Sequence, residues 1–335
     1  MRDIARLSGA SIATVSRVIN NPEKVSRRTY DKVMNVIKEN RYTPNQSAVN
    51  LFSGESKSIA IFVYDLGNPF YSSLVHHLNN IAFRHGYMLL VCDAGGNPEI
   101  EARFYRYCVG IRISGIVLTI GSAQGVPVED LSSSIPLVCI DRESFGTQPC
   151  YSVQSDYENG TRLLIDNLYR LNHRKIGYIT GTTGFISSAQ RTNSFLNHMR
   201  RLGLDVPNRY LYEGEFSVQC GVSSFDYFYS MSDPPTAIIT ADDQIARGFI
   251  MRANALGVAI PDEFSVCGMD AVDSSIFYPP ITSIQQNIYA ISHAAFDFIY
   301  NFPIEPPPCA KVIGVSIYPG QTCHKIPLNH HTSEK

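Results

Sequence analysis

The hydrophobic pattern of the N-terminal region predicts three short helices. The stretch RDIARLS has apolar residues at helical spacing, and a turn of about three residues separates it from a second periodic run that begins after Ser11. A third run, VSRRTYDKVMNVIKEN, has apolar positions at i, i+3, i+4 and i+7 behind Ser26, and serine is a favoured N-cap residue. The first two helices with their short connection have the pattern of a helix-turn-helix.

The second of these helices, in SGASIATVSRVINN, has two different faces. At about 100° per residue, Val15, Val18 and Ile19 fall within one arc, which we interpret as the core stripe. The opposite arc carries small, hydrogen-bonding and cationic side chains, namely Ile12, Ala13, Ser16, Arg17 and Asn20. This outer face is free to contact a partner, although the pattern alone also allows a helical subdomain that packs on the rest of the protein.

The segment TPNQSAVNLFSGESKS joins this region to the remainder of the chain. Asn45 can cap one short helix over residues 46–52, but an isolated helix of fewer than ~12 residues is marginal in water. We therefore expect a connector that folds only when it is docked.

From Ser58 onward, apolar runs typical of buried strands alternate with helical patterns. The runs are SIAIFVY, YMLLVCD, SGIVLTI, IPLVCID, KIGYITG, TAIITADD and FSVCGMD. Continuous apolar strands in β–α alternation indicate parallel sheets that are covered on both faces. We expect two Rossmann-like lobes, and hence a fold with an all-α helix-turn-helix headpiece, a hinge helix and a two-lobed α/β domain.

Polar residues follow several of these predicted strands. Ligands of parallel α/β sheets bind beyond the carboxyl ends of the strands. The residues at those ends are Asp65, Asp141, Arg142, Asp242, Asp243 and Asp270. Converging carboxylates suit a neutral ligand rich in hydroxyl groups, although each aspartate could equally cap the helix that follows it.

The N-terminal 57 residues and the rest of the chain also differ in net charge. Residues 1–57 hold ten Lys and Arg against five Asp and Glu, which leaves −7 for the rest of a chain whose total charge is −2. The basic part therefore favours a polyanionic partner. No dinucleotide, phosphate-loop, nucleophile-elbow or zinc-protease motif stands in a suitable context, so we expect no enzyme and no cofactor.

The eight cysteines are spread without metal-ligand spacing, so buried free thiols in a reducing compartment are expected, and no metal site. The N-terminus shows helical periodicity where a signal peptide would be apolar, and no apolar stretch approaches 18 residues. We therefore expect a soluble cytoplasmic protein without membrane contact. The C-terminal stretch QTCHKIPLNHHTSEK is expected to be a solvated polar tail, and its histidines are not expected to bind metal.

The order, spacing and residue types of DIARLSGASIATVSRVIN, VSRRTYDKV and YTPN resemble the DNA-binding headpiece and hinge of the lac-repressor (LacI/GalR) family of bacterial transcription regulators. The resemblance implies that Ile12, Ala13 and Arg17 face base edges in the major groove, and that Leu51 is a wedge inserted in the minor groove. It places five other residues against the DNA backbone, namely Ser11, Thr14, Ser16, Asn20 and Tyr42.

Two departures from the family pattern stand out. Val49 and Phe52 occupy hinge positions that usually carry Arg or Lys, which removes phosphate contacts that would help to dock the hinge. The threonine that normally caps the first helix would lie before Met1. Either this cap is absent or the true start lies a few residues upstream.

The body resembles the same family through GNPFYSSL, TAIITADDQIARG, IPDEFSVCGMD and PPITSIQQ. The resemblance implies two lobes joined by three crossovers near Ser155, Gln286 and Tyr318. By position, Arg191 would grip a small-molecule effector, with Asp270 opposite it. Phe216 would stack on the effector, and contacts would also come from Tyr71, Asp141 and Asp242.

The resulting division has residues 1–44 as the headpiece, 45–57 as the hinge helix and linker, 58–320 as the effector-binding and dimerisation domain, and 321–335 as the tail. Lobe 1 would comprise about 58–155 and 287–318, and lobe 2 about 156–286 with the C-terminal end. We expect a homodimeric regulator, a repressor, that binds double-stranded operator DNA and is switched by a sugar or sugar derivative. A nucleobase or nucleoside co-repressor is the alternative effector, and a sugar-binding transport protein is the alternative of another class.

Overall fold

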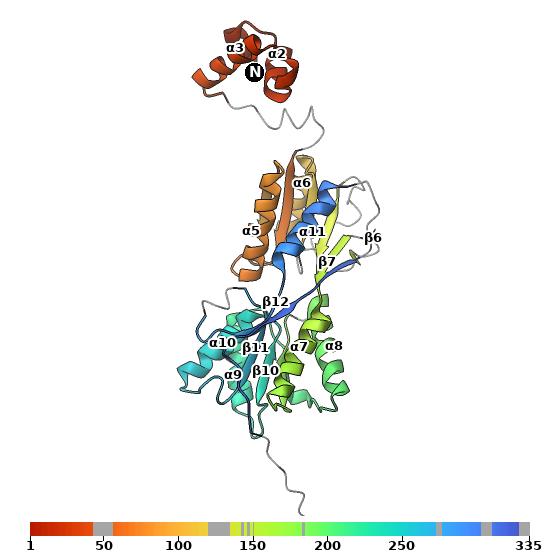
Figure 1. Ribbon diagram of the computed structural model, residues 1–335, viewed down its shortest axis with the longest axis vertical. Coiled ribbons are helices and arrows are strands. Elements are labelled where there is room, and N and C mark those ends of the chain that lie inside the picture. The colour runs from red at the N-terminus through yellow and green to blue at the C-terminus, as the bar shows by residue number, and fades with distance from the viewer. Residues whose placement is uncertain are drawn as a thin grey trace, which may run out of the picture. The chain divides into compact units, whose positions relative to one another are not determined.

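The computed structural model describes residues 1–42, 56–119, 135–141, 144–145, 148–149, 151–182, 185–272, 277–302 and 310–327. The chain divides into two compact units, Met1–Ser56 and Lys57–Lys335 (Figure 1). Several predictions lie outside the described residues, namely those on the hinge helix with Val49, Leu51 and Phe52, on Arg142, and on the histidines at 330 and 331.

The first unit contains the three expected helices. They are α1 (Arg2–Ser8), α2 (Ile12–Asn20) and α3 (Arg27–Glu39), with a 3₁₀ turn at Pro22–Lys24. The Ser11 hydroxyl accepts a hydrogen bond from the Thr14 amide at 3.0 Å and so caps α2, and Ser26 caps α3 in the same way. Gly9 ends α1 at a φ of 60°, a left-handed conformation that glycine adopts without strain. The core consists of Ile4, Ala5, Val15, Val18 and Val33.

The first helix begins without a side-chain cap. Met1 is its N-cap residue and makes no capping hydrogen bond. Its amino group instead donates to the Tyr42 hydroxyl at 2.8 Å, which ties the two ends of the helical region together.

The second unit contains two six-stranded sheets, which we assign to lobe 1 and lobe 2 (Figure 1). The first sheet has the order β13-β7-β4-β3-β1-β2 and all its strands are parallel. The second has the order β14-β12-β11-β10-β8-β9, with only its edge strand β14 antiparallel. The first sheet comprises β1 (Ser58–Val63), β2 (Met88–Asp93), β3 (Gly115–Leu118), β4 (Leu137–Ile140), β7 (Tyr151–Ser155) and β13 (Ala310–Ile313).

The second sheet comprises β8 (Ile176–Ile179), β9 (Leu211–Tyr212), β10 (Ala237–Thr240), β11 (Ser265–Asp270), β12 (Thr282–Gln285) and β14 (Ser316–Tyr318). A small hairpin pairs β5 (Ser144–Phe145) with β6 (Gln148–Pro149). The helices of the unit are α5 (Pro69–Arg84), α6 (Pro98–Gly110), α7 (Tyr157–Arg170), α8 (Ile186–Arg201), α9 (Val218–Tyr229), α10 (Asp243–Ala255) and α11 (Ile288–Tyr300), with a 3₁₀ turn at Asn208–Tyr210.

Helices cover both faces of the first sheet, as the continuous apolar strands predicted. Ile59, Ile61 and Val63 point to α5 and α11, whereas the alternate residues Ala60 and Phe62 point to α6. In lobe 2, α7 packs on α8 and α9 on α10. The last pair is in backbone contact, because a Cβ added at Gly248 would lie 1.9 Å from the Val218 carbonyl oxygen. The two-lobed parallel α/β fold is confirmed.

The chain passes between the lobes three times. It does so between β7 and α7, between β12 and α11, and between β13 and β14. The third passage had been expected near Tyr318, but it lies at residues 314–315, because Ile313 ends a strand of the first sheet and Ser316 begins one of the second. Lobe 1 therefore ends at Ile313, and residues 316–318 belong to lobe 2.

The prediction of a solvated tail from residue 321 is wrong for its first part. The side chain of Thr322 is fully buried, and its hydroxyl donates to the Val266 carbonyl and accepts from the Thr282 amide. The Val266 amide donates to the Thr322 carbonyl at 2.8 Å. A polar sequence can enter a core edge in this way when each polar group finds a partner. We call residues 320–327 the C-terminal strap.

The strap also covers a buried histidine of lobe 2. One ring nitrogen of His173 lies 2.9 Å from the Thr236 hydroxyl, and the other lies 3.1 Å from the His324 carbonyl oxygen. Burial lowers the pKa of His173 from its ordinary 6.5 to about 4. The ring is therefore neutral at physiological pH, with one nitrogen donating and the other accepting.

We expect a His173→Gln variant to lose less stability in acid than the wild type. Between pH 6.5 and about 4 the unfolded chain binds a proton that folded His173 excludes, so the free energy of unfolding falls as the pH drops through this window. This proton uptake lowers the free energy of unfolding of the wild type by about 2 kcal/mol near pH 5. Urea unfolding at pH 7 and pH 5 tests this, and an identical pH dependence in both proteins would contradict it.

Candidate functional site

The outer face of α2 is exposed as the sequence pattern predicted. Ile12, Ala13 and Arg17 are exposed, with 48% of Ile12 accessible, whereas Val15 and Val18 are buried in the core. About half of the Ile12 side chain is thus accessible to solvent. The exposed side chain of Arg17 lies on the same face, one helical turn from Ala13. The face therefore offers apolar contact and bidentate hydrogen bonding side by side.

Two hydroxyls on this face already have a structural role. The hydroxyls of Ser11 and Thr14 lie 2.8 Å apart, and Ser11 also accepts from the Thr14 amide. The helix start is thus held rigid at the edge of the outer face, while Thr14 and Ser16 are half-buried. Tyr42, which is also half-buried, lies beside Met1, and the Asn20 side chain is outside the described set.

The structure gathers the six predicted effector residues in the second unit, at the carboxyl ends of its strands and on the helices beside them. Five of them are buried, and Phe216 is half-buried. Asp141 follows β4, Asp242 follows β10, and Asp270 ends β11. Arg191 lies on α8 and Tyr71 on α5, so residues of both lobes contribute.

Arg191 is the centre of this cluster and only 4% of it is exposed. Its guanidinium donates to the Ala241 carbonyl, and its Cζ lies 4.1 Å from the centre of the Tyr157 ring and 5.8 Å from that of Phe216. Burial alone would lower the pKa of Arg191, but Tyr157 and the carboxylates of Asp270 and Asp141 outweigh it and raise the pKa. The guanidinium is thus a permanent buried cation held against aromatic faces.

Asp141 and Tyr157 form a hydrogen-bonded pair beside Arg191. The Tyr157 hydroxyl donates to one Asp141 oxygen, and the Ser155 amide donates to the other at 3.4 Å. Asp141 has a φ of 58°, a left-handed conformation that costs a non-glycine residue about 1 kcal/mol or more. Burial raises the pKa of Asp141, although the charge of Arg191 opposes the rise.

Asp242 and Asp270 form the second acidic part, in lobe 2. Asp242 caps α10 by accepting from the Ile245 amide at 2.9 Å, and burial raises its pKa to about 6. Asp270 accepts a 2.6 Å hydrogen bond from the Gln286 amide group, and burial followed by the charge of Asp243 raises its pKa well above the ordinary value. Asp242 therefore caps a helix and also belongs to the cluster around Arg191.

Contacts between the lobes adjoin this cluster. The Asn68 side chain, which caps α5 in lobe 1, donates to Asp242 in lobe 2 at 3.3 Å. The rings of Tyr64 and Phe185 meet edge to face with centres 5.7 Å apart, and Phe185 in turn lies 6.2 Å from Phe216. A molecule that displaced any of these groups would change how the lobes are held together.

Comparisons with known proteins agree with this arrangement. A family model of the bacterial regulatory proteins of the lacI family matches residues 1–45, and a periplasmic binding protein-like domain matches residues 165–323. The HTH-type transcriptional repressor PurR of Vibrio vulnificus (strain CMCP6) is 30% identical over 305 residues, which cover 89% of this chain and 90% of PurR. The chain belongs to the lacI family of bacterial regulatory proteins.

Further similarities extend over almost the whole of this lacI-family protein. The HTH-type transcriptional repressor CytR of Escherichia coli (strain K12) is 29% identical over 88% of this chain and 87% of CytR. A crystal structure of the lac repressor bound to ONPG in the repressed state has a TM-score of 0.83 at 25% identity, covering 96% of this chain and 98% of that one. The protein is thus a DNA-binding transcription regulator and not an enzyme, and the alternative of a transport protein is set aside.

The sequence interpretation missed several residues of the cluster. Tyr157 directly follows the first crossover, and its position could have been found from that crossover. Asn68 and Phe185 contact groups more than 30 positions away, which no local pattern reveals. Within the described residues, no helix of this regulator is long and apolar enough to cross a membrane.

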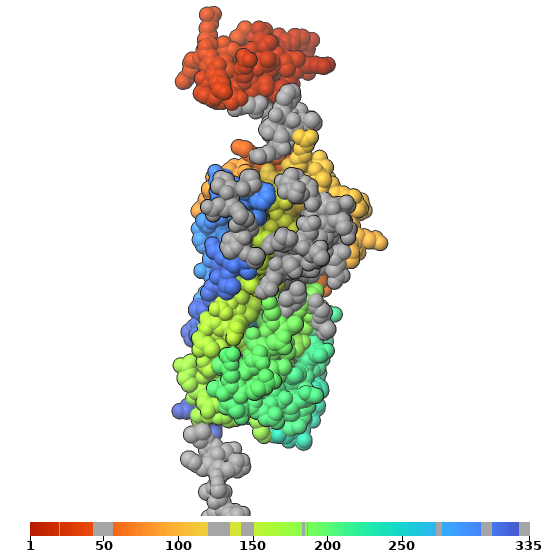
Figure 2. All heavy atoms as spheres, turned by 90° about the vertical axis from the view of Figure 1, so that its right-hand side faces the viewer, coloured from red at the N-terminus to blue at the C-terminus, as the bar shows by residue number. Residues whose placement is uncertain are grey.

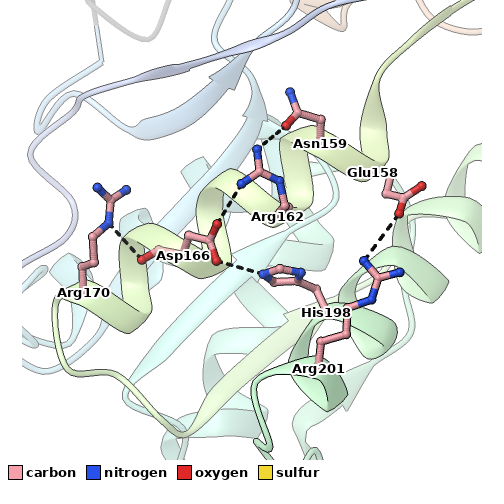
Figure 3. Close-up of polar contacts among 7 residues, drawn as sticks. All are labelled: Glu158, Asn159, Arg162, Asp166, Arg170, His198 and Arg201. Atoms are coloured by element: carbon pink, nitrogen blue, oxygen red, sulfur yellow. Dashed lines mark hydrogen bonds and ion pairs between the residues drawn. The ribbon is translucent and has the colours of Figure 1, made fainter.

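A second polar region of the regulator lies on the surface formed by α7 and α8, on the side that Figure 2 shows. Asp166 accepts from His198 at 2.9 Å and from Arg162 at 3.0 Å, and Arg201 lies 3.9 Å from Glu158 (Figure 3). These ion pairs line, or adjoin, a groove of about 630 Å³. Because most of the groups are partly exposed, each pair contributes little stability. The contacts of His198 and Arg201 join α8 to α7, whereas Arg162 and Asp166 both lie on α7.

Proposed function

We propose that this regulator is a repressor that binds a pseudo-palindromic operator as a homodimer, with one headpiece on each half-site. The exposed outer face of α2 supports this proposal. Arg17 would donate to guanine O6 and N7, and Ile12 and Ala13 would contact a thymine methyl group. Ser11, Thr14, Ser16, Asn20 and Tyr42 would bind the DNA backbone, and Leu51 would be the minor-groove wedge.

The proposal of a homodimer is supported by an exposed apolar edge of lobe 1. Strand β2 is an edge of the first sheet and leaves 64% of Met88 and part of Val91 exposed. Phe83, at the end of the preceding helix α5, is exposed as well. A second copy would cover these apolar groups and the edge of β2 with which no other described strand pairs. Left uncovered, such a surface invites non-specific association.

The single observation that supports an effector site is the setting of Arg191, between Asp141, Tyr157 and Phe216. A guanidinium, several carboxylates and an aromatic face suit a sugar or sugar derivative, since carboxylates accept hydrogen bonds from hydroxyl groups and the ring covers the apolar face of a sugar. The proposed contacts are those of Tyr71, Asp141, Arg191, Phe216, Asp242 and Asp270.

A nucleobase or nucleoside acting as co-repressor is the second candidate. The parallel rings of Phe185 and Phe216 favour it, because aromatic side chains also stack on nucleobases. Either ligand would act by changing the contacts between the lobes. By linkage, an effector that weakens operator binding must itself bind less tightly to the DNA complex.

A thermal-shift screen of sugars, sugar phosphates, nucleobases and nucleosides tests the effector proposal, because a ligand specific for the native state raises the melting temperature. We expect one chemical class to raise it and to change operator binding in a gel-shift assay. The operator itself comes from selection on random DNA, where two inverted half-sites are expected. Selection of a single, non-repeated site would contradict the dimeric repressor.

A further inference from the structure

Two cysteines face each other where the C-terminal strap meets the second sheet. The sulfur of Cys267, on β11, lies 3.4 Å from the sulfur of Cys323. The backbone holds this pair in register, because the Val266 amide donates to the Thr322 carbonyl and the His324 amide donates to the Ser265 hydroxyl at 3.1 Å. A disulfide needs a sulfur separation of about 2.05 Å, so the two side chains must approach by only about 1.4 Å.

The two thiols differ in accessibility and in acidity. Cys267 is completely buried, whereas Cys323 is partly accessible to solvent. A hydrogen bond from Cys267 lowers the pKa of Cys323 and, together with burial, raises that of Cys267. Cys323 therefore carries the larger thiolate fraction, and only a thiolate attacks an oxidant rapidly.

Three other cysteines, Cys92, Cys108 and Cys220, have no such activation. Burial raises the pKa of Cys92 to about 11, of Cys108 to about 12 and of Cys220 to about 11. Thiols with these values remain protonated near neutral pH, so they react slowly with oxidants. A mild oxidant should thus distinguish Cys323 from these three.

We propose that Cys267 and Cys323 form a reversible dithiol–disulfide site that is oxidised by hydroperoxides. The Cys323 thiolate attacks the peroxide oxygen, which breaks the O–O bond and gives a sulfenic acid and, after protonation, water. The Cys267 sulfur then attacks the Cys323 sulfur, and the sulfenic oxygen leaves as a second water. Two thiols lose two electrons and two protons, and hydrogen peroxide takes up both. A thiol reductant reverses the change through a mixed disulfide.

Oxidation would tie the strap covalently to β11. The strap otherwise holds to lobe 2 by hydrogen bonds, including those of Thr322 and the Ile326 amide with the Leu171 carbonyl. The new bond closes a loop of the chain from Cys267 to Cys323 and restricts the unfolded state. We expect the oxidised protein to melt at a higher temperature, and the increase to disappear after reduction.

Mass spectrometry of the full-length protein tests the proposal directly. The protein is treated with low concentrations of hydrogen peroxide, its free thiols are alkylated, and it is digested without reduction. We expect a linked peptide pair that contains Cys267 and Cys323, formation of this pair before other oxidation, and a decrease from eight titratable thiols to six in the unfolded chain. Dithiothreitol should restore all eight.

Two variants separate a specific site from general oxidation. Cys323→Ser should abolish the linked pair and the reversible increase in melting temperature, and Cys220→Ser, in the same lobe, should change neither. Conversion of wild-type Cys323 to a sulfinic or sulfonic acid without linkage to Cys267 would overturn the proposal, as would preferential linkage of either cysteine to another chain. The mass-spectrometric result on the wild type stands even if a variant fails to fold.

Discussion

Replacement of Arg191 by alanine should abolish the response to the effector while operator binding remains. The guanidinium is the only cation that the described residues place against Asp141, Asp270 and Tyr157, and it is almost completely buried. Loss of one member of a buried, hydrogen-bonded charge cluster costs about 2–5 kcal/mol of binding free energy, or roughly 30- to 5,000-fold in Kd. Calorimetry with the ligand from the screen measures this loss.

The matched control for this experiment is Arg201→Ala on the same helix. Its side chain is 68% exposed and lies 3.9 Å from the carboxylate of Glu158, so effector affinity should not change. Arg191→Lys should give an intermediate loss, since an ammonium keeps the charge but not the planar fork. Normal effector affinity in Arg191→Ala would remove this residue from the site. Melting curves of all variants show whether the lobe remains folded.

Arg17→Ala should weaken binding to the selected operator by about 1–3 kcal/mol. Its guanidinium is the group proposed to read a base from the exposed face of α2, and its loss removes one bidentate base contact. Affinity for random DNA should fall much less, because non-specific binding depends on total charge. Fluorescence anisotropy at fixed salt concentration measures both.

Arg6→Ala is the control for the headpiece. Arg6 lies on α1, is exposed and pairs with Asp3 at 3.6 Å, so its removal changes the charge of the unit equally without touching the face of α2. Should Arg17→Ala reduce operator and random-DNA affinity by the same factor, its side chain would be a phosphate contact and not a reader of bases.

The parts of the fold that depend on local pattern could be predicted from the sequence. Ser11 and Ser26 marked helix starts, and the apolar runs marked buried strands, because capping and periodicity act over a few neighbouring residues. The effector cluster was predicted from strand ends and from the family resemblance, and its members do lie together. Their individual roles stay predictions until a ligand is bound.

Long-range contacts could not be predicted in this way. The Asn68–Asp242 hydrogen bond joins residues 174 positions apart, and the pairing of Cys267 with Cys323 needs the strap to reach β11. The strap itself looked like a tail because its sequence is polar, and only the positions of Val266 and Thr282 show why it is buried. Local patterns contain no information on which distant group will supply the partner.

The brevity of the third crossover affects how the lobes can move. Only Gly314 and Val315 separate β13 from β14, and both strands are edges of their sheets. Two residues supply four soft dihedral angles, of which glycine contributes the two with the widest range. The lobes can therefore turn about this connection but cannot slide apart along it. A ligand that binds at Arg191 would therefore act on a joint that turns about a few dihedral angles but cannot lengthen.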